Sequence, residues 1–405
     1  MATILGRRSY NVRSDRIVPN VLPNIILVDN DIRRAHFLAF SMGLTSVDTD
    51  QEKVTWDVDE FSPITDTLSA AVASTTNTII PVSNPSYFLP EEIWQNKRTD
   101  EIIQVKEVNI GTSNITVIRG ATALNSSGGT AAANMSSGDQ LNKISSLMSE
   151  NSSRQITRTT TPTEVFNFCQ PQRKDLSLSL RQMKRKFLNG SELPFQTQKA
   201  MKEHRMDMNR TKLFGEKARF TDANGDDVTA TGGIRPFITT NVLDVGGTLF
   251  KSDLDTFLVN KGLRFGSTRK ILFASNEVIL AFTNMLDTIS SHDVTISGSM
   301  GATIGTQVLH YKAPNGSEIA IVEDRNITEQ HPGEAYGVDM SELQVRPFSG
   351  NGISGDLQLI TGTEDPDDLG TVSTFVSDDC ITYGYEKAHF KLKNVSGGSF
   401  SVPIV

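Results

Sequence analysis

The chain has 405 residues, of which 37% are hydrophobic, and it carries a formal net charge of −8. That length allows two or three domains of ordinary size. The acidic balance argues against sequence-independent binding of nucleic acid, which depends on a basic surface. No apolar run approaches the roughly 20 residues that cross a bilayer, and two cysteines are too few for a disulfide framework.

Residues 1–53 are expected to form an extended arm and not a domain. Pro19 and Pro23 bias the backbone before them to extended conformations. The apolar run at 25–28 has little flanking structure to bury it, so we expect it to dock on the chain's own body or on a neighbour. The first residues lack the apolar core of a secretion signal, which indicates a soluble protein of a reducing cytoplasm.

The next segment, residues 54–145, has the composition of a small β-rich lobe. Alternating apolar and polar residues predict short strands at 77–82, 101–108, 114–119 and 140–144. Two of these strands flank Gly111–Ser113, a typical hairpin signal. We expect a projecting lobe with little hydrophobic core of its own.

The stretch Pro194–Phe214 predicts one long helix. Pro194 suits the first helical position, and Gly215 can take the left-handed conformation that ends a helix. The few apolar residues between them form too narrow a stripe for a helix inside a core. We therefore expect the helix to lie across a sheet or against another chain, with Glu203 and His204 as a surface pair.

Strands are predicted before this helix at 163–170 and 176–180. After it, the acidic segment 221–227 resembles a calcium loop in composition. An EF-hand loop needs Gly at its sixth position and Glu at its twelfth, but counting from Asp222 the sequence places Gly225 fourth and Gly233 twelfth. A plain turn is the better interpretation.

Beyond residue 248 the sequence alternates most clearly between helix and strand. Ser252 and Asp255 form a capping box for a short helix. Ser275 is expected to cap a second helix, whose apolar face consists of Val278, Ile279, Phe282, Met285, Leu286 and Ile289. Strands are expected at 269–274, 303–311, 317–323, 340–346, 380–385 and 388–392. Residues 364–379 are expected to be a long acidic loop.

No group of residues has the spacing of a known catalytic, metal or cofactor site. The six histidines include no pair at the helical spacing of a zinc site, and no phosphate-binding loop or nucleophile elbow is present. The Gly-rich segment 298–305 and the basic run Lys184–Lys186 are interpreted as a flexible and a solvated turn. Cys169 and Cys380 are expected to be reduced, partly buried thiols. We predict no catalytic, cofactor-binding or metal-binding residue.

The order of these elements resembles the major capsid proteins of tailed bacteriophages. Phe166–Gln170 resembles the N-x-x-Q strand that enters their peripheral domain. Pro194–Gly215 is similar to their spine helix, which often ends in Leu-Phe-Gly in the branch with an inserted β-rich segment. Thr231–Ile234, followed by Thr239–Asn241, resembles the glycine turn after the spine. The likeness covers most of the chain from residue 159 to 393.

The resemblance implies an α+β fold, the tailed-phage major capsid fold. Its implied parts are an N-terminal arm (1–53), an extended loop or E-loop with a β-rich insertion (54–145), a peripheral domain with the spine helix (146–235 and 335–405) and an axial domain (236–334).

The implied function is to self-assemble into hexamers and pentamers of an icosahedral head that encloses the double-stranded DNA genome, without enzyme activity. Neighbouring subunits would exchange arms and loops. Candidate partners are scaffolding, portal and decoration proteins, and packaged DNA would be contacted non-specifically. A fused helical scaffolding extension is not expected. The protein would be assembled in the bacterial host cytoplasm, without a membrane, and reside in the virion capsid. Some relatives lock the shell by covalent Lys–Asn links, for which no partners are identified.

Two other interpretations remain open from the sequence. One is a different virion structural protein, such as a tail-tube or decoration subunit, although the helices after Thr248 disfavour the all-β fold expected of it. The other is an enzyme whose site gathers dispersed residues, for example Asp222, Asp226, His292 and Glu323.

Overall fold

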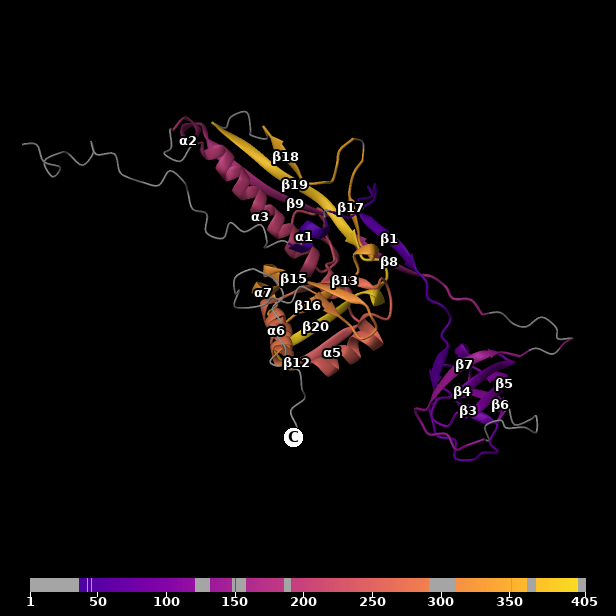
Figure 1. Cartoon of the computed structure of the whole chain (residues 1–405). Helices are drawn as coiled ribbons and strands as arrows, with labels where there is room; N and C mark the ends of the chain where they lie inside the picture. The colour runs from indigo at the N-terminus through magenta and orange to yellow at the C-terminus, as the bar shows by residue number, and fades with distance from the viewer. Residues whose placement is uncertain are drawn as a thin grey trace, which may run out of the picture. The chain divides into compact units, whose positions relative to one another are not determined.

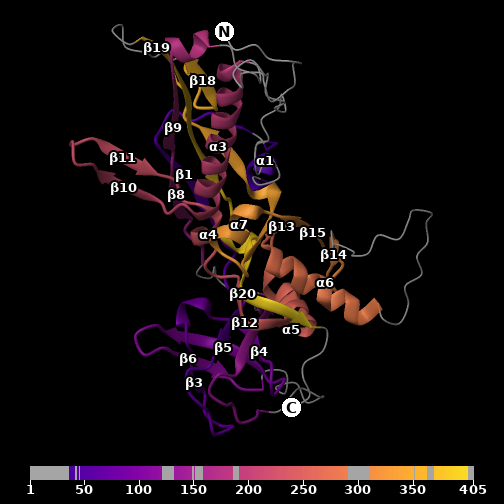
Figure 2. The same cartoon turned by 90° about the vertical axis from the view of Figure 1, so that its left-hand side faces the viewer.

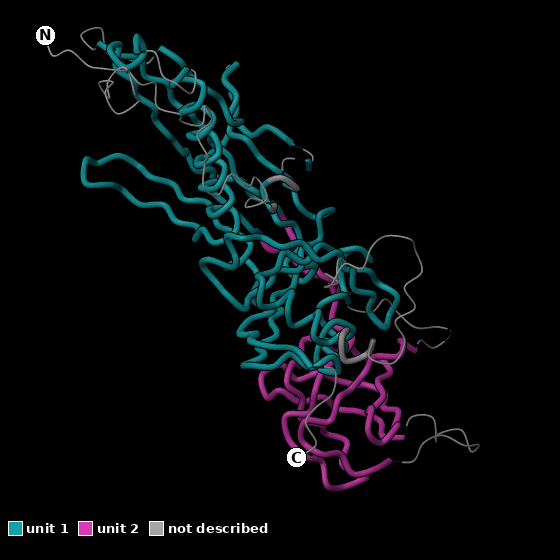
Figure 3. The backbone as a smooth tube through the Cα atoms, turned by 60° about the vertical axis from the view of Figure 1, so that its left-hand side comes forward, with its two compact units in different colours: residues 1–56, 165–405 teal, residues 57–164 magenta. Residues whose placement is uncertain are grey.

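The computed structural model describes residues 36–41, 43–44, 46–120, 132–147, 150, 158–185, 191–290, 310–350, 352–362 and 369–399. The expectations for the arm before His36, for His292 and for the Gly-rich segment 298–305 lie outside these residues. The chain divides into two compact units, which Figure 3 colours separately. Unit 1 combines residues 1–56 with 165–405, and unit 2 comprises residues 57–164.

Unit 2 is an antiparallel six-stranded sheet, in the order β2-β7-β4-β5-β6-β3. The strands are β2 (Thr65–Thr67), β3 (Ile79–Pro81), β4 (Glu92–Asn96), β5 (Ile102–Asn109), β6 (Asn114–Ile118) and β7 (Gln140–Ser146), with a 3-10 turn at Pro85–Tyr87. The predicted hairpin is confirmed, since β5 pairs with β6 from Gln104↔Ile118 to Asn109↔Asn114.

The expectation that this lobe has little core of its own is wrong. Trp94 is fully buried and its ring lies 4.2 Å from that of Phe88. Around them the inward residues of the strands form a closed cluster that includes Leu68, Val72, Ile80, Val82, Ile103, Val105, Ile115, Val117, Met135 and Leu141. The segment after residue 131 is held to the sheet by the Arg98–Asp139 ion pair and by Glu101, which pairs with Arg119 and accepts the Ala133 amide.

One sheet of unit 1 lies beneath the long helix. It consists of β9 (Gln170–Ser179), β17 (Gln344–Pro347), β18 (Gln358–Thr361) and β19 (Gly370–Thr382), with β19 pairing antiparallel to the other three. Figures 1 and 2 both show β9, β18 and β19 running alongside α3 (Glu192–Phe214). The prediction of a helix across a sheet is therefore confirmed.

Much of the expected acidic loop 364–379 is instead the central strand of this sheet. β19 alternates β-branched residues with polar ones and pairs with β9 along its length, from Gly370↔Ser179 to Asp379↔Gln170. Its most acidic end is stabilised by charge, since buried Asp379 pairs with Lys212 of α3. Pairing with three strands outweighs the low strand preference of aspartate.

The end of α3 is made by close backbone packing and not by a left-handed glycine. Gly215 has φ −54° and ψ 144°. A Cβ atom there would lie 2.5 Å from the carbonyl oxygen of Thr231 and 2.6 Å from that of Thr211. The helix therefore needs glycine at this position because another backbone segment approaches it.

A second sheet of unit 1 has the order β12-β20-β16-β13-β15-β14. Its strands are β12 (Val242–Phe250), β13 (Arg269–Ala274), β14 (His310–Lys312), β15 (Glu318–Glu323), β16 (Ala335–Val338) and β20 (Phe390–Ser399). β12 pairs parallel with β20 and β13 parallel with β15, and the other pairs are antiparallel. β16 and β20, which the sequence placed with the peripheral segment, thus share a sheet with strands of the expected axial segment.

Both faces of this sheet are covered. Leu272 and Ala274 of β13 face a cluster with α5 (Lys251–Phe257) and α6 (Asn276–Ser290). Phe273, between them, faces the opposite cluster and lies 5.1 Å from the ring of Phe37. That second cluster includes the end of α3 and the short helices α1 (His36–Ser41) and α4 (Ile234–Phe237). The predicted buried strand is confirmed, and the alternation along it separates the two cores.

The predicted capping box of α5 is wrong. The helix begins at Lys251, directly after β12, and a π-helical turn at Leu258–Gly262 extends it. Asp255 accepts hydrogen bonds from the Lys251 ammonium and the Tyr311 hydroxyl. Ser252 is therefore the second residue of the helix and not its N-cap, and the Asp255 carboxylate is engaged by other donors.

The remaining elements are short. β1 (Lys53–Val58) pairs with β8 (Thr163–Phe168), and β10 (Ala218–Thr221) pairs with β11 (Asp227–Ala230) as a hairpin whose turn is the acidic segment. The helical pieces are α2 (Leu180–Lys184), α7 (Arg325–Gln330) and 3-10 turns at Met340–Glu342 and Glu386–Ala388. None of the helices in the described residues is both long and apolar enough to span a membrane.

Candidate functional site

The titratable residues singled out from the sequence do not converge. Asp222 and Asp226 lie in the exposed β10–β11 turn, where Asp222 accepts hydrogen bonds from the amides of Asn224 and Asp226. Glu323 ends β15 in the second sheet. Among the described residues, no three His, Cys, Asp or Glu side chains are grouped so as to hold a metal ion. The interpretation of the acidic segment as a plain turn is confirmed.

The histidine on α3 is not the surface residue expected. His204 is buried, and its Nε2 lies 3.0 Å from the Ser377 hydroxyl on β19. Burial lowers the pKa of His204, so the ring is neutral at pH 7. The side chain therefore fastens the helix to the sheet.

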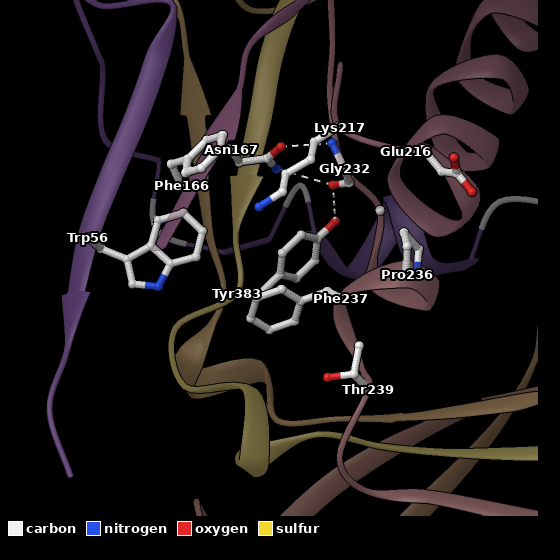
Figure 4. A pocket seen from close by; sticks show the side chains of 11 residues that line it. Trp56, Phe166, Asn167, Glu216, Lys217, Gly232, Pro236, Phe237, Thr239 and Tyr383 are labelled. Carbon is white, nitrogen blue, oxygen red and sulfur yellow. Dashed lines mark hydrogen bonds between the residues drawn. The ribbon is translucent and has the colours of Figure 1, made fainter. Parts of the chain in front are cut away.

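A pocket of about 350 Å³ lies in unit 1, where three of the sequence motifs meet. Figure 4 shows its walls, which are aromatic on two sides. The lining residues are Trp56, Phe166, Asn167, Glu216, Lys217, Gly232, Gly233, Pro236, Phe237, Thr239 and Tyr383.

Asn167 connects the N-x-x-Q strand to the glycine turn. Its Oδ1 accepts the Gly232 amide at 2.7 Å, and its Nδ2 donates to the carbonyl oxygens of Gly232 and Ile381 at 3.1 and 2.8 Å. Gln170 accepts the amide of Thr231 at 3.1 Å. Asn167 lies near the end of β8 and Gln170 begins β9, so the junction of these two strands binds two consecutive residues of the turn.

The glycine turn also packs against the end of the spine helix. The Gly233 amide donates to the Gly215 carbonyl at 2.7 Å, and a Cβ atom on Gly233 would lie 2.7 Å from the carbonyl of Leu213. Asn241, from the last motif, donates to the carbonyls of Lys387 and His389. The motif residues therefore hold backbone segments together and are not arranged for chemistry.

The aromatic walls are also supported by backbone. The Tyr383 hydroxyl lies 3.1 Å from the carbonyl oxygens of Lys212 and Gly232, and the Trp56 Nε1–H donates to Gly384. Burial raises the pKa of Tyr383, so the phenol stays neutral. The rings of Phe237 and Tyr383 stack at 5.0 Å. With their polar ends engaged, these side chains offer the pocket mainly apolar surface.

Positive charge lies beside this apolar surface. The ammonium groups of Lys53 and Lys217 lie 4.5 and 4.0 Å from the ring centre of Phe166, within cation–π range. The lining also holds the acidic Glu216, so the positive charge is confined to the wall at Phe166, and that wall suits an apolar group with acidic neighbours. This pocket could not be predicted from the sequence, because Trp56, Phe237 and Tyr383 come from three distant segments with no shared pattern.

A second feature missed from the sequence is the attachment of α1. The Phe37 amide donates to Asp324 Oδ2 at 3.1 Å, and the Leu38 amide donates to Asn209 Oδ1 at 2.7 Å. Asp324 also accepts from Asn209 and caps α7 through the Asn326 amide. Burial raises the pKa of Asp324 above its ordinary value, although these hydrogen bonds oppose the rise. Helix α1 is thus docked on α3 and on Asp324, the N-cap residue of α7.

A scan of protein-family models matches residues 16–396 to the SU10 major capsid protein family. Solved structures with similar folds include the capsid of a native GTA particle (TM-score 0.47, 7% identity, covering 97% of this chain and 100% of that one). A structure from Mycobacterium phage Patience has a TM-score of 0.38 at 12% identity and covers 64% of this chain and 78% of that one. The SrpI encapsulin of Synechococcus elongatus PCC 7942 has a TM-score of 0.39 at 11% identity and covers 60% of this chain and 80% of that one. No curated protein matches significantly.

Proposed function

Because the chain belongs to the SU10 major capsid protein family and is the major capsid protein of a tailed-phage head, we propose that it builds this head from hexamers and pentamers. These would tile an icosahedral shell around double-stranded DNA. The observation that carries the proposal is the family match over nearly the whole chain. A tail-tube or decoration subunit and an enzyme do not fit a family of structural capsid proteins.

We assign the expected domains to the two sheets of unit 1. The peripheral domain is built on β9, β17, β18 and β19 with α3, and the axial domain on the sheet of β12 to β16 with β20. Unit 2 corresponds to the E-loop, and residues 1–53 to the arm. Support comes from sheet membership, since each sheet has its own hydrogen-bonded ladder.

The partner we assign to the aromatic pocket is a second copy of the chain. A shell subunit must bury apolar surface against its own copies, and ring-forming contacts join two different patches. Phe61 is fully exposed, the highest value among the large apolar residues described, and Asp57 and Asp59 precede it. An aromatic ring with acidic neighbours complements the apolar pocket and the two lysines. We therefore place Phe61 of one copy in the pocket of the next.

The other partners that we propose are the ones expected from the sequence. Scaffolding, portal and decoration proteins are proposed to bind the shell, and the acidic chain is proposed to touch packaged DNA without a sequence preference. A net charge of −8 suits this role, because a strongly basic wall would hold the DNA by counterion release. Assembly is proposed to occur in the host cytoplasm.

Negative-stain imaging of the purified chain, with and without crowding agent, tests the proposal. We expect closed shells or flat sheets in which sixfold and fivefold rings occur together. Stacked rings of a single size, trimers, or monomers under every condition would contradict it.

A further inference from the structure

The two cysteines of the chain, 211 positions apart in sequence, lie against one another in unit 1. The Sγ atoms of Cys169 and Cys380 are 3.5 Å apart. Both thiols are free, and the residues are 2% and 0% exposed. Together with Val54 they form a separate small cluster of buried residues. From the sequence, two reduced and partly buried thiols were expected.

The strand register explains the contact. β9 and β19 run antiparallel and their last pair is Gln170↔Asp379, so extending this register by one residue beyond the ladder sets Cys169 opposite Cys380. The Cys169 amide donates to the Glu52 carbonyl at 2.8 Å, and its carbonyl accepts the Thr229 hydroxyl at 2.6 Å. With its amide and carbonyl bonded elsewhere, Cys169 faces Cys380 as in a non-hydrogen-bonded pair, where side chains approach most closely.

That geometry fits a disulfide. In non-hydrogen-bonded pairs the Cα atoms are about 4.5 Å apart, and disulfides span Cα separations of about 4.4 to 6.8 Å. The sulfurs need to approach by roughly 1.5 Å to reach a bond length near 2.04 Å. A rotation of each side chain supplies a movement of that size without breaking the ladder.

We propose that Cys169 and Cys380 form a disulfide when the protein leaves a reducing compartment. With a small disulfide such as oxidised glutathione as oxidant, one protein thiolate attacks a glutathione sulfur and releases one glutathione. The second protein thiolate then attacks the mixed disulfide and releases the other. The protein loses two protons and two electrons, and one glutathione disulfide becomes two thiols.

Burial sets the rate of this reaction. The neighbouring Cys169 thiol and burial raise the pKa of Cys380, so little reactive thiolate is present at neutral pH. Thiols stay reduced in a cytoplasm and oxidise outside cells. The bond would therefore form slowly once the protein meets an oxidising medium, and it would join Cys169, the residue before β9, to β19. This inference does not depend on the proposed function.

The test uses the full chain in two arms, one oxidised while folded and one refolded from denaturant in a glutathione redox buffer. We expect free thiols per denatured chain to fall from two to none in the refolded arm and more slowly in the folded arm. Mass spectrometry should show the loss of two hydrogens and a peptide pair joining Cys169 to Cys380. The unfolding midpoint should rise by roughly 5–10 °C and return on reduction.

Cys169→Ser and Cys380→Ser are the matched variants, and each should keep one thiol with no rise in the midpoint. If Cys380→Ser fails to fold, Cys380→Ala replaces it. Thiol counting on the unmodified chain still decides whether the disulfide forms. Two free thiols after refolding in the redox buffer would overturn the proposal. Disulfides that only link separate chains, seen as dimers on a non-reducing gel, would do the same.

Discussion

Asn167 has a side chain whose donors and acceptor are all engaged by backbone. It bonds to both the amide and the carbonyl of Gly232 and to the carbonyl of Ile381. Among neutral side chains, only the amide of Asn or Gln offers two N–H donors together with an acceptor oxygen. The place of Asn167 in the N-x-x-Q motif is thus explained by the backbone groups that it binds, and not by a reaction.

Replacing Asn167 by alanine should lower the free energy of unfolding by about 2–3 kcal/mol, because buried backbone groups of Gly232 and Ile381 lose their partner. Denaturant unfolding of the unassembled chain measures this loss of free energy. Asn315→Ala is the matched control, since the exposed Asn315 amide makes a single bond to the Ser317 backbone and its loss should cost under about 0.5 kcal/mol. Equal effects of the two substitutions would contradict the account.

Asp378 on β19 predicts a pH dependence. Burial, followed by the negative charges of Asp379 and Glu52, raises its pKa from 3.8 to about 6. Its Oδ1 is buried without a hydrogen-bond partner among the described residues. As the pH rises from about 4 to about 6, the unfolded chain loses this proton first, so the folded state loses stability over that window.

Asp378→Asn removes this titration while keeping the shape of the side chain. We expect the variant to be more stable than the unmodified chain by about 1 kcal/mol at pH 8, a value reduced because the group is only half buried. The difference should shrink through pH 6 and vanish near pH 4. Chemical unfolding at several pH values measures it, and a difference that does not change with pH would refute the assignment.

At the scale of elements, the sequence predicts the helices and strands whose formation depends on residues close together in the chain. The α3 helix, the β5–β6 hairpin and the β13 strand follow from periodicity and turn residues, and the structure confirms them. β19 did not follow, because the pairing with β9 that makes an acidic stretch a strand is nearly 200 residues away in sequence. For the same reason the pocket and the cysteine pair could not be predicted, whereas the motif residues that line the pocket could.

The docking of α1 gives an element-scale prediction. Asn209→Ala removes the acceptor of the Leu38 amide and a donor to Asp324. We expect hydrogen exchange at the amides of 36–41 to accelerate about tenfold, which corresponds to about 1.4 kcal/mol of local opening. The control is Lys199→Ala, an exposed position nearer the start of α3. Unchanged exchange in the Asn209 variant would show that α1 is held by apolar packing alone.

At the scale of the whole molecule, the apolar surface that a single chain exposes indicates where copies of a capsid protein meet. Phe61 at 100% exposure costs solubility in a monomer and is expected to be covered in the shell. Acidic residues outnumber basic ones in unit 2, whereas two lysines lie at the Phe166 wall of the unit 1 pocket, whose lining also holds Glu216. Such complementarity favours contacts between unlike patches of successive copies, as a ring requires.

Phe61→Ala should raise the protein concentration needed for assembly about tenfold, equivalent to about 1.4 kcal/mol, while monomer stability stays unchanged. Ile110→Ala, which shortens another exposed apolar residue of unit 2, should have a smaller effect. Lys217→Glu should weaken assembly by placing like charges together, and Asp59→Lys in the same chain should restore it. Light scattering of assembly reactions measures all four variants. If the double variant assembles no better than Lys217→Glu alone, Phe61 and its acidic neighbours do not occupy this pocket.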